Sequence, residues 1–243
     1  MARSAAFKVM SSYTAFPDNI ALAEHAAQQW LQLLAARDDS KPFTVALSGG
    51  RTPKLLYKAV AKQMAEVSFN NVHFFWGDER MVPRTDEESN FKLAAVRLFQ
   101  ALKFPDSQVH RILTERGEAI AVQQAEAEIC RIANLNGRGQ PILDLVFLGM
   151  GEDGHVASLF PGDAEALESK AVYRAVTGPK APPRRITLGF PALAAAREVW
   201  VLVSGQGKAE AMRASLLEAG TTPLAKVLQS RTHTEIFTDF DLA

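Results

Sequence analysis

Short apolar runs rich in Val, Ile and Phe alternate along the chain with longer segments in which apolar residues recur at helical spacing. Short continuous apolar runs are typical of buried strands, whereas helical spacing over a longer segment is typical of a helix with one buried side. The predicted strands are Phe43–Leu47, Val72–Trp76, Ile142–Leu148, Arg185–Leu188, Val199–Val203 and Thr234–Thr238. The predicted helices are Ile20–Ala36, Pro53–Ala65, Phe91–Leu102, Glu118–Ala133 and Lys208–Ala219.

This alternation predicts an α/β fold in which a largely parallel sheet is flanked by helices, as in Rossmann-like proteins. The Gly- and Pro-bearing stretches Asn136–Pro141 and Gly178–Pro183 are typical of loops, not of domain linkers, and no internal repeat occurs. We therefore expect residues 1–243 to form a single domain. In open parallel sheets the ligand crevice lies beyond the carboxyl ends of the strands, which directs attention to the residues that follow each strand.

A glycine-containing turn follows the first of these strands. It reads Ser48-Gly49-Gly50-Arg51-Thr52-Pro53. Thr52 and Pro53 suit the N-cap and first position of a helix, and the glycines permit a tight turn with outward N–H groups. These N–H groups, the helix dipole and the Ser48 and Thr52 hydroxyls favour a phosphate or carboxylate. An ordinary strand–helix turn is the alternative.

Three charged residues, Asp78, Glu79 and Arg80, follow the apolar strand Val72–Trp76 after a single glycine. Arg80 is suited to holding a phosphate bidentately, and Asp78 or Glu79 could orient it or accept a sugar hydroxyl. Structural salt bridges are the competing interpretation.

The most apolar strand is followed by Gly149-Met150-Gly151-Glu152-Asp153-Gly154-His155-Val156-Ala157-Ser158. A histidine in a glycine-rich turn beyond a central strand is a candidate catalytic base. Asp153 and Glu152 are near enough in sequence to orient the imidazole or support its charge, and Gly154 is expected to lie against the substrate. The alternative for His155 is a structural histidine.

Two further cations lie near strand ends: Arg185, at the start of a predicted strand beside Arg184, and Lys208 in the segment Ser204–Lys208. Lys208 is the stronger candidate, because glycines before a helix again form an anion cradle, here with an added ammonium group. Either residue could instead be a surface cation.

Composition limits the other classes of function. Lys plus Arg and Asp plus Glu both total 27, so no global field draws the chain to nucleic acid, and any anion site must be local. The one cysteine, Cys130, is expected to be a small buried hydrophobe without chemistry, and it indicates a reducing compartment. No secretory signal or membrane span is apparent, which favours a cytoplasmic protein. The remaining histidines show no ligand spacing, so no metal site is expected.

This set of groups suits direct attack by water on a cyclic ester, since the chain has no Gly-x-Ser-x-Gly elbow and no strong covalent nucleophile. His155 would take a proton from water and later return it to the leaving ring oxygen. Arg185 or a backbone N–H would stabilise the oxyanion. Ser48–Thr52, Arg80 and Lys208 would anchor a phosphate remote from the reacting carbon.

Several segments together resemble the 6-phosphogluconolactonase family, within the wider group that includes the glucosamine-6-phosphate isomerases. They are Leu47–Pro53, Trp76–Arg80, Ser89–Asn90, Leu148–Pro161, Pro182–Thr187 and Gly205–Lys208. The resemblance implies the isomerase fold and hydrolysis of 6-phospho-D-glucono-1,5-lactone, a small sugar phosphate, without a metal or organic cofactor. It implies a general-base role for His155 and phosphate contacts for the Gly49–Gly50 turn, Arg80 and Lys208. Arg185 corresponds to the family's arginine before Ile-Thr, and Arg51 replaces the Ser or Thr of many relatives.

Two alternatives remain open at the level of the sequence. An amino-sugar-phosphate isomerase needs an additional carboxylate base, and such relatives typically have Asp-Glu-Tyr where this chain has Asp78-Glu79-Arg80. A non-catalytic sugar-phosphate sensor would carry a DNA-binding helix-turn-helix, but the residues before Phe43 predict one strand and one long amphipathic helix. The sequence predicts no oligomeric state.

Overall fold

The main sheet of the protein consists of parallel strands. The computed structural model describes residues 11–64, 67–102 and 104–242. The six-stranded sheet has the order β1-β11-β10-β7-β2-β3, and each neighbouring pair is parallel. Its strands are β1 (Ser11–Ala15), β2 (Phe43–Leu47), β3 (Val72–Trp76), β7 (Leu145–Leu148), β10 (Glu198–Val203) and β11 (Thr234–Thr238). The predicted parallel sheet is confirmed.

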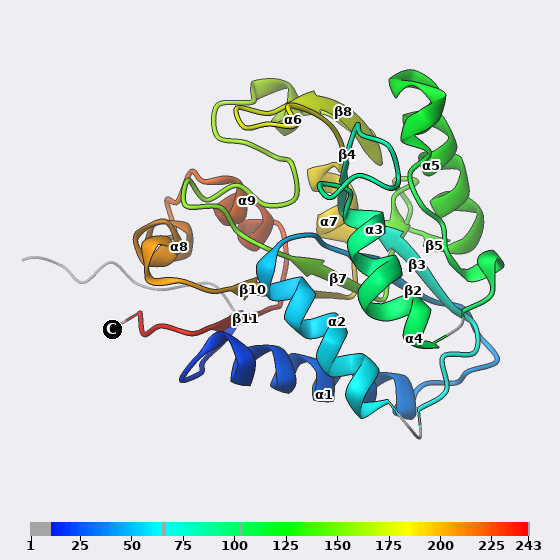
Figure 1. Cartoon of the computed structure of the whole chain (residues 1–243). Helices are drawn as coiled ribbons and strands as arrows, with labels where there is room; N and C mark the ends of the chain where they lie inside the picture. Colours follow the sequence, from blue (N-terminus) through cyan, green and yellow to red (C-terminus); the bar gives the residue numbers. More distant parts are fainter. Residues whose placement is uncertain (1–10, 65–66, 103, 243) are drawn as a thin grey trace, which may run out of the picture.

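Helices cover both faces of this sheet (Figure 1), with α1 and α2 on one side and α7 and α9 on the other. The longer helices are α1 (Asn19–Ala36), α2 (Arg51–Gln63), α5 (Glu118–Ile132), α8 (Ala209–Leu216) and α9 (Pro223–Gln229). The shorter helices are α3 (Asn90–Ala94), α4 (Gln100–Leu102), α6 (Ala164–Glu168) and α7 (Phe190–Ala195). Because both faces are covered, every residue of β7 is buried, as its unbroken apolar run predicts.

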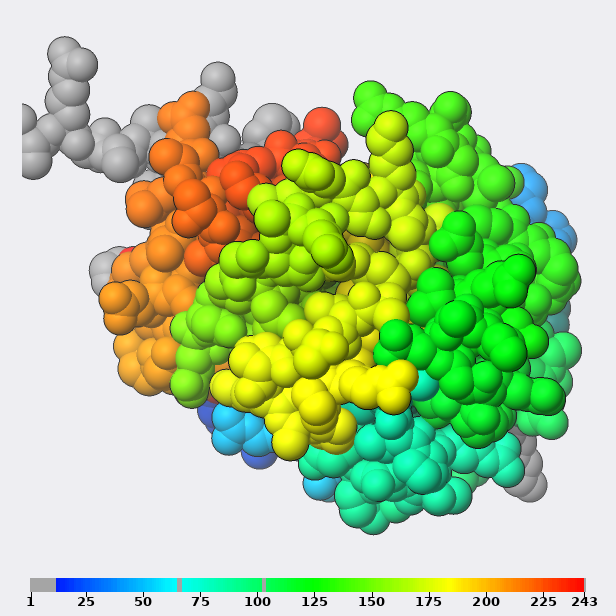
Figure 2. Space-filling model, turned by 90° about the horizontal axis from the view of Figure 1, so that it is seen from above, coloured from blue at the N-terminus to red at the C-terminus, as the bar shows by residue number. Residues whose placement is uncertain are grey.

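A small antiparallel sheet with the order β4-β9-β8 lies beside the main sheet. Its strands are β4 (Asp78–Arg80), β8 (Tyr173–Thr177) and β9 (Arg184–Leu188). In Figure 2 the β8–β9 segment, in yellow, covers the middle of the upper face next to green α5. The strand predicted at Arg185–Leu188 is therefore real but does not join the parallel sheet, because it pairs with β4 and β8 instead.

Other predicted elements need smaller corrections. The apolar stretch Ile142–Leu148 is divided between β6 (Pro141–Ile142), which forms a two-stranded hairpin with β5 (Asn134–Leu135), and β7. The helix predicted from Lys208 to Ala219 is shorter at both ends, because residues Gln206–Lys208 form a 3-10 turn before α8 and the backbone becomes extended at Leu217, the C-cap. The predicted helix Phe91–Leu102 contains a π-helical turn at Ala95–Phe99. The predicted end of α2 at Ala65 and the signal analysis of residues 1–10 fall outside the described residues.

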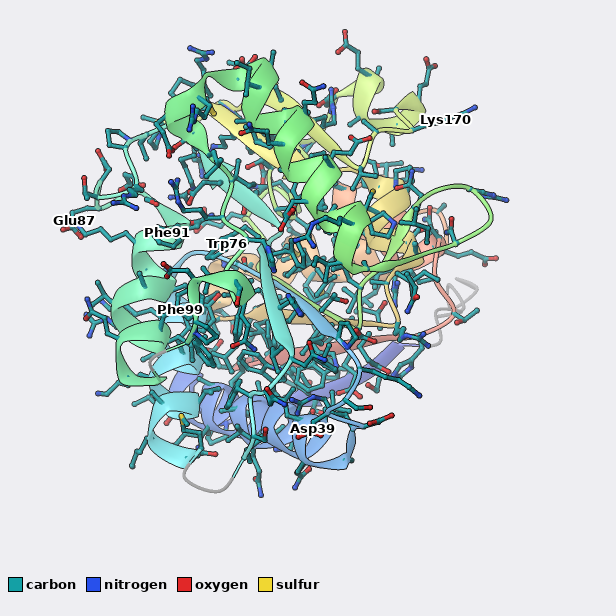
Figure 3. The ribbon with its side chains drawn as sticks, turned by 90° about the vertical axis from the view of Figure 1, so that its right-hand side faces the viewer. Asp39, Trp76, Glu87, Phe91, Phe99 and Lys170 are labelled. Atoms are coloured by element: carbon teal, nitrogen blue, oxygen red, sulfur yellow. The ribbon has the colours of Figure 1, made fainter. Side chains whose placement is uncertain are left out.

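Aromatic side chains fill the junction between β3 and α3. The Trp76 ring centroid lies 5.6 Å from that of Phe91 and 6.1 Å from that of Phe99, and Figure 3 labels these three residues close to one another, with Trp76 nearest the middle of the molecule. Trp76 is fully buried. This packing holds the start of α3 against the carboxyl end of β3, where β4 begins.

None of the helices in the described ranges is long and apolar enough to cross a membrane.

A pair of histidines links β3 to the segment before α5. His73 Nδ1 lies 2.9 Å from His110 Nε2, and His110 Nδ1 lies 2.8 Å from a Glu128 carboxylate oxygen. Burial lowers the pKa of both histidines below the ordinary value of 6.5, and the charge of His110 lowers the pKa of His73 further. The folded protein therefore binds fewer protons here than the unfolded chain does once the pH falls below that value.

We expect this histidine pair to make the protein less stable in acid. A lowered folded-state pKa stabilises the fold above the unfolded-state value, and this contribution is lost as the pH falls below about 6.5. Urea unfolding at pH 7.5 and 5.5 should show a smaller free energy of unfolding at the lower pH. The loss should be smaller in His73→Gln, which removes one titrating ring, and an equal loss in both proteins would contradict this interpretation.

Candidate active site

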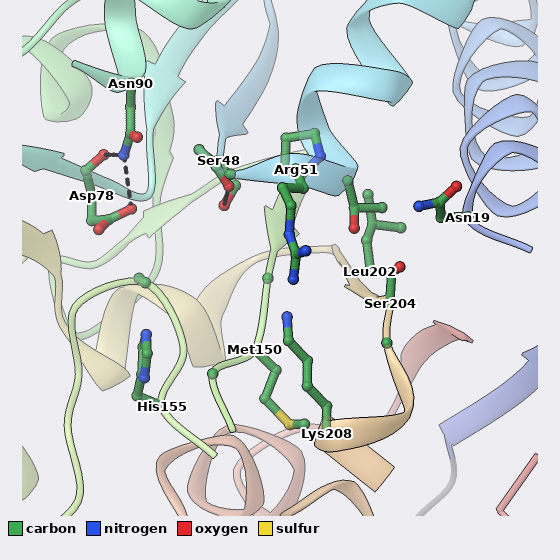
Figure 4. Close-up of a pocket in the computed structure, with 18 of the residues that line it drawn as sticks. Asn19, Ser48, Arg51, Asp78, Asn90, Met150, His155, Leu202, Ser204 and Lys208 are labelled. Carbon is green, nitrogen blue, oxygen red and sulfur yellow. Dashed lines mark hydrogen bonds between the residues drawn. The ribbon is translucent and has the colours of Figure 1, made fainter. Parts of the chain in front are cut away.

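A cavity of about 530 Å³ opens beyond the carboxyl ends of the central parallel strands, as the fold class predicts. Its walls come from the turns after β2, β7, β10 and β11, together with β4 and β9 of the small sheet. Figure 4 shows the labelled side chains converging on this space from different elements. The candidate residues that line it are Ser48, Gly49, Gly50, Arg51, Thr52, Asp78, Arg80, His155, Arg185 and Lys208.

The amino end of α2 forms one wall of the cavity. The helix begins at Arg51 with Gly50 as its N-cap, so the expectation that Thr52 is the N-cap and Pro53 the first helical residue is wrong by two positions. Gly50 has φ of 102°, a left-handed value that favours glycine and moves the cap back along the chain. No side chain caps this end, so its first N–H groups remain available to an anion.

The turn that leads into α2 is held from beneath by Tyr57. Its buried hydroxyl donates to the Ser48 carbonyl over 2.6 Å and accepts from the Ser48 N–H over 3.1 Å. On the other side, a Cβ atom at Gly49 would lie 1.8 Å from Asn90 Oδ1. Only glycine permits this approach, so the turn is fixed by contacts on both sides. A fixed turn keeps its N–H groups aimed at the same point of the cavity.

His155 lies on the cavity wall with its imidazole oriented by Asp153. The Nδ1 atom is 2.5 Å from Asp153 Oδ1, and the His155 side chain is 20% exposed. Burial raises the pKa of Asp153, but hydrogen bonds from the imidazole and the backbone outweigh it and lower that pKa. An ionised carboxylate only accepts, so Nδ1 carries the proton and Nε2 is left as the basic nitrogen. Asp153 itself does not line the cavity.

Arg80 and Arg185 face each other across the β4–β9 pair. Both line the cavity, and Arg185 is only 6% exposed. Burial lowers the pKa of Arg185, and the charge of Arg80 lowers it further. Like charges opposite each other in an antiparallel pair are unfavourable unless an anion lies between or beside them. Glu88 supplies part of this negative charge, because its carboxylate accepts from the Arg80 guanidinium over 3.2 Å, so the structural salt bridge considered for Arg80 is present. Arg185 has no such partner among the described residues, and a negatively charged ligand would complement it.

The choice between the adjacent arginines is clear in the structure. Arg184 is exposed and bonds to Glu118 on α5. Arg185 donates to the backbone carbonyls of Pro182 and Lys180, and its guanidinium carbon lies 5.6 Å from the Phe160 ring centroid. The same ring packs against His155, with centroids 4.9 Å apart. Arg185 is thus the cavity residue and lies on the side where His155 stands.

Lys208 and Arg51 form a second cationic group. Figure 4 shows their side chains pointing toward each other from the 3-10 turn before α8 and from the start of α2. Burial lowers the pKa of Lys208, and the charge of Arg51 adds to this effect. Arg51 is exposed, whereas Lys208 is partly buried. A phosphate group placed between these two cations would neutralise both.

Asp78 and Glu79 have different surroundings although they adjoin in sequence. Asp78 lines the cavity, and its carboxylate accepts from Ser158 Oγ over 2.6 Å and from Asn90 Nδ2 over 3.3 Å. Glu79 is buried away from the cavity, and burial raises the pKa of its carboxyl group. That group accepts the Ser89 hydroxyl and the backbone N–H groups of residues 80, 90 and 91. Glu79 therefore ties β4 to α3 and orients no ligand.

Two other residues of the β7 turn differ from expectation. Gly154 does not line the cavity, because it is buried with φ of 79° and a Cβ atom there would lie 2.7 Å from Thr222 Cβ. Its glycine is needed by the turn and by close packing against α9. Glu152 is exposed beside Gly207, and its charge raises the pKa of Lys208.

Sequence reasoning missed several wall residues, including Asn90, Ser204 and Asp239. Asp239 accepts the Ser204 hydroxyl over 2.6 Å and the Gly205 N–H over 2.8 Å, which fixes the loop that carries Lys208. Ser204 directly follows β10 and Asp239 directly follows β11. Both residues therefore occupy strand ends, the positions at which parallel topology predicts ligand contacts.

Two further sets of potentially reactive side chains lie outside the cavity. Cys130 is half-buried on α5, and burial raises the pKa of its thiol, so it is poorly suited to act as a nucleophile. Within the described ranges, Glu198, His233 and Glu235 place possible metal-ligand atoms within 4.8 Å of one another. They lie at the amino ends of β10 and β11, at the opposite ends of these strands from the cavity.

Comparison with known proteins gives the family. The family model for glucosamine-6-phosphate isomerases/6-phosphogluconolactonase matches residues 17–237. The 6-phosphogluconolactonase of Mycobacterium tuberculosis is 36% identical over 221 residues, or 88% of this chain and 89% of the relative. That of Aggregatibacter actinomycetemcomitans is 31% identical over 96% of this chain and 98% of the relative.

Solved structures agree with these relatives. The crystal structure of 6-phosphogluconolactonase from Leishmania guyanensis superposes with a TM-score of 0.83 at 29% identity and covers 94% of this chain and 96% of its own. The structure from Thermotoga maritima gives a TM-score of 0.79 at 30% identity and covers 95% of this chain and 99% of its own. The chain therefore belongs to the family of glucosamine-6-phosphate isomerases and 6-phosphogluconolactonases.

Proposed function

We propose that this protein hydrolyses 6-phospho-D-glucono-1,5-lactone to 6-phospho-D-gluconate, in the oxidative pentose phosphate pathway and in the cytoplasm, with residues 1–243 acting as one domain. The observation that carries the proposal is that the oriented base His155 and four cations line one cavity of about 530 Å³, a size suited to a hexose phosphate. These four cations are Arg51, Arg80, Arg185 and Lys208. The relatives named above carry this activity in their names.

The reaction begins at the basic nitrogen of His155. Nε2 takes a proton from water while the water oxygen attacks the lactone carbonyl carbon, and Asp153 stabilises the imidazolium that forms. Arg185, on the same side of the cavity as His155, stabilises the oxyanion. When the intermediate collapses, the bond to the ring oxygen breaks and the imidazolium returns its proton to that oxygen. The new carboxylic acid then loses its proton to solvent.

The phosphate is held apart from the reacting carbon. The uncapped N–H groups of α2 and the side chains of Arg51 and Lys208 form one anion site, and Arg80 adds a further positive charge. Binding of this remote phosphate positions the lactone carbonyl next to His155, so part of the binding energy is used to orient the substrate for reaction. Side chains and backbone N–H groups of this protein carry out every step, and the proposed reaction uses neither a metal nor an organic cofactor.

An amino-sugar-phosphate isomerase is the competing function within the family. Proton transfer between sugar carbons would need a second carboxylate base, and the carboxylates that line the cavity are those of Asp239 and Asp78. Asp239 already accepts from Ser204 and from the Gly205 N–H. The other candidate is Asp78. Its oxygens are already engaged by Ser158 and Asn90, and Arg80 stands where such isomerases typically have tyrosine. These contacts favour the lactonase.

The two functions are separated by parallel assays of the purified protein. With freshly generated 6-phosphogluconolactone we expect turnover well above the spontaneous ring opening measured without protein. With glucosamine 6-phosphate we expect no release of ammonia. Ammonia release without accelerated lactone opening would replace the lactonase by the isomerase, and inactivity on both substrates would remove the proposal.

A further inference from the structure

Gly151 lies directly under the His155–Asp153 pair. A Cβ atom at this position would lie 2.1 Å from His155 Nδ1, 2.2 Å from His155 Cε1 and 2.6 Å from Asp153 Oδ1. The Gly151 N–H donates to the His155 carbonyl over 2.9 Å, and its own carbonyl accepts the Gly154 N–H over 3.0 Å. The imidazole edge that bonds Asp153 therefore rests on the backbone of Gly151.

The conformation of the backbone does not explain this glycine. Gly154, in the same turn, has φ of 79° and needs glycine for that reason, whereas Gly151 is not in the left-handed region. Gly149, two residues earlier, offers the opposite case, because the nearest atom to a Cβ there is Ser48 Oγ at 4.0 Å. A methyl group thus fits at Gly149 but collides with the imidazole at Gly151.

We propose that Gly151 is a positioning residue for catalysis, because its missing side chain lets the imidazole and carboxylate pack against the turn with Nε2 free for water. This inference rests on the proposed role of His155 as the base. The Phe160 ring, 4.9 Å from the imidazole centroid, leaves the ring little room to retreat from a methyl group. The three atoms nearest to a Cβ at Gly151 belong to His155 and Asp153, and none of them belongs to α2 or to the Lys208 turn.

Gly151→Ala should therefore separate turnover from binding. A displacement of about 1 Å at a catalytic group costs on the order of 100-fold in rate, so kcat should fall by about that factor. The inhibition constant of 6-phosphogluconate should change by less than about threefold, because the phosphate site is built from other elements. A general loss of structure would instead weaken both.

The effect of Gly151 on the imidazole can be measured directly from the protonation and tautomer state of His155. Long-range proton–nitrogen NMR spectra of nitrogen-labelled protein, assigned with His155→Gln, report both states across a pH titration. Gly151→Ala should change the tautomer signals and the titration midpoint of His155, and Gly149→Ala should leave both unchanged. Unchanged His155 signals together with an unchanged kcat in Gly151→Ala would overturn the proposal.

A thermodynamic cycle covers the case in which Gly151→Ala is poorly folded. Gly151→Ala should lower the melting temperature in the native background but much less in a His155→Ala background, where the colliding ring is absent. An equal loss in both backgrounds would overturn the proposal. Neither this cycle nor the NMR titration depends on lactone hydrolysis. Failure of the proposed function would be seen separately, as inactivity of the native protein on 6-phosphogluconolactone, and failure of the base role as full activity in His155→Ala.

Discussion

His155→Ala is expected to lower kcat for 6-phosphogluconolactone by about 100-fold or more. General-base catalysis typically contributes 10²–10⁴ in rate, and no other imidazole lines the cavity among the described residues. Initial rates must be corrected for spontaneous ring opening, which sets the lowest measurable activity. The substitution removes no phosphate contact, so calorimetry should show that the variant still binds 6-phosphogluconate.

His233→Ala provides the matched control for this experiment. His233 is half-exposed and precedes β11, at the end of the sheet remote from the cavity, so its loss should leave kcat unchanged. Native turnover in His155→Ala would remove the imidazole from the mechanism. Loss of product binding together with turnover would show instead that His155 supports the cavity as a whole.

The sequence predicts the main sheet well because burial leaves a local signal. β7 is buried on both faces and its sequence is continuously apolar, so both its position and its central place could be recognised. The cavity residues near His155 and Lys208 could be found because they follow such strands, and the resemblance to the family adds their roles. This agreement reflects parallel topology, which gathers the ends of distant strands at one edge.

The small antiparallel sheet was not predictable in the same way. Asp78, Glu79 and Arg80 form a strand only because β9 pairs with them, and three consecutive charged residues carry no strand signal of their own. Asp78 lines the cavity and Glu79 is buried away from it, and this difference depends on hydrogen bonds from Asn90 on α3 and Ser158 in the β7 turn. Such contacts are tertiary, so neither residue spacing nor composition reports them.

The start of α2 shows a different limit of prediction from sequence, because local residue preferences misplace the first helical residue. Thr52 and Pro53 are good cap and first-turn residues, and local preference places the helix start there. The structure starts the helix two residues earlier, since Gly50 takes the left-handed conformation and Thr52 is buried against the cavity wall. The shift places Arg51 on the first turn of the helix, where its side chain faces Lys208.

Removal of Lys208 is expected to have the second largest effect, this time on binding. A charge-assisted hydrogen bond contributes about 1.5–3 kcal/mol, so Lys208→Ala should raise the Michaelis constant for the lactone about 10- to 100-fold with a much smaller change in kcat. Lys58→Ala is the matched control, because Lys58 is an exposed lysine on α2 that does not line the cavity. An unchanged Michaelis constant in Lys208→Ala would remove its phosphate role.

The pH dependence of product binding gives an independent check on Lys208. Burial, and then the charge of Arg51, lower the pKa of Lys208 from the ordinary value of 10.5, and only the protonated ammonium attracts phosphate. The affinity for 6-phosphogluconate should therefore weaken as the pH rises, beginning below the pH at which an ordinary lysine titrates. Calorimetry from pH 7 to 10 should show this loss in the native protein and in Lys58→Ala, and a much flatter profile in Lys208→Ala. A profile that keeps its slope without Lys208 would assign the titration to another group.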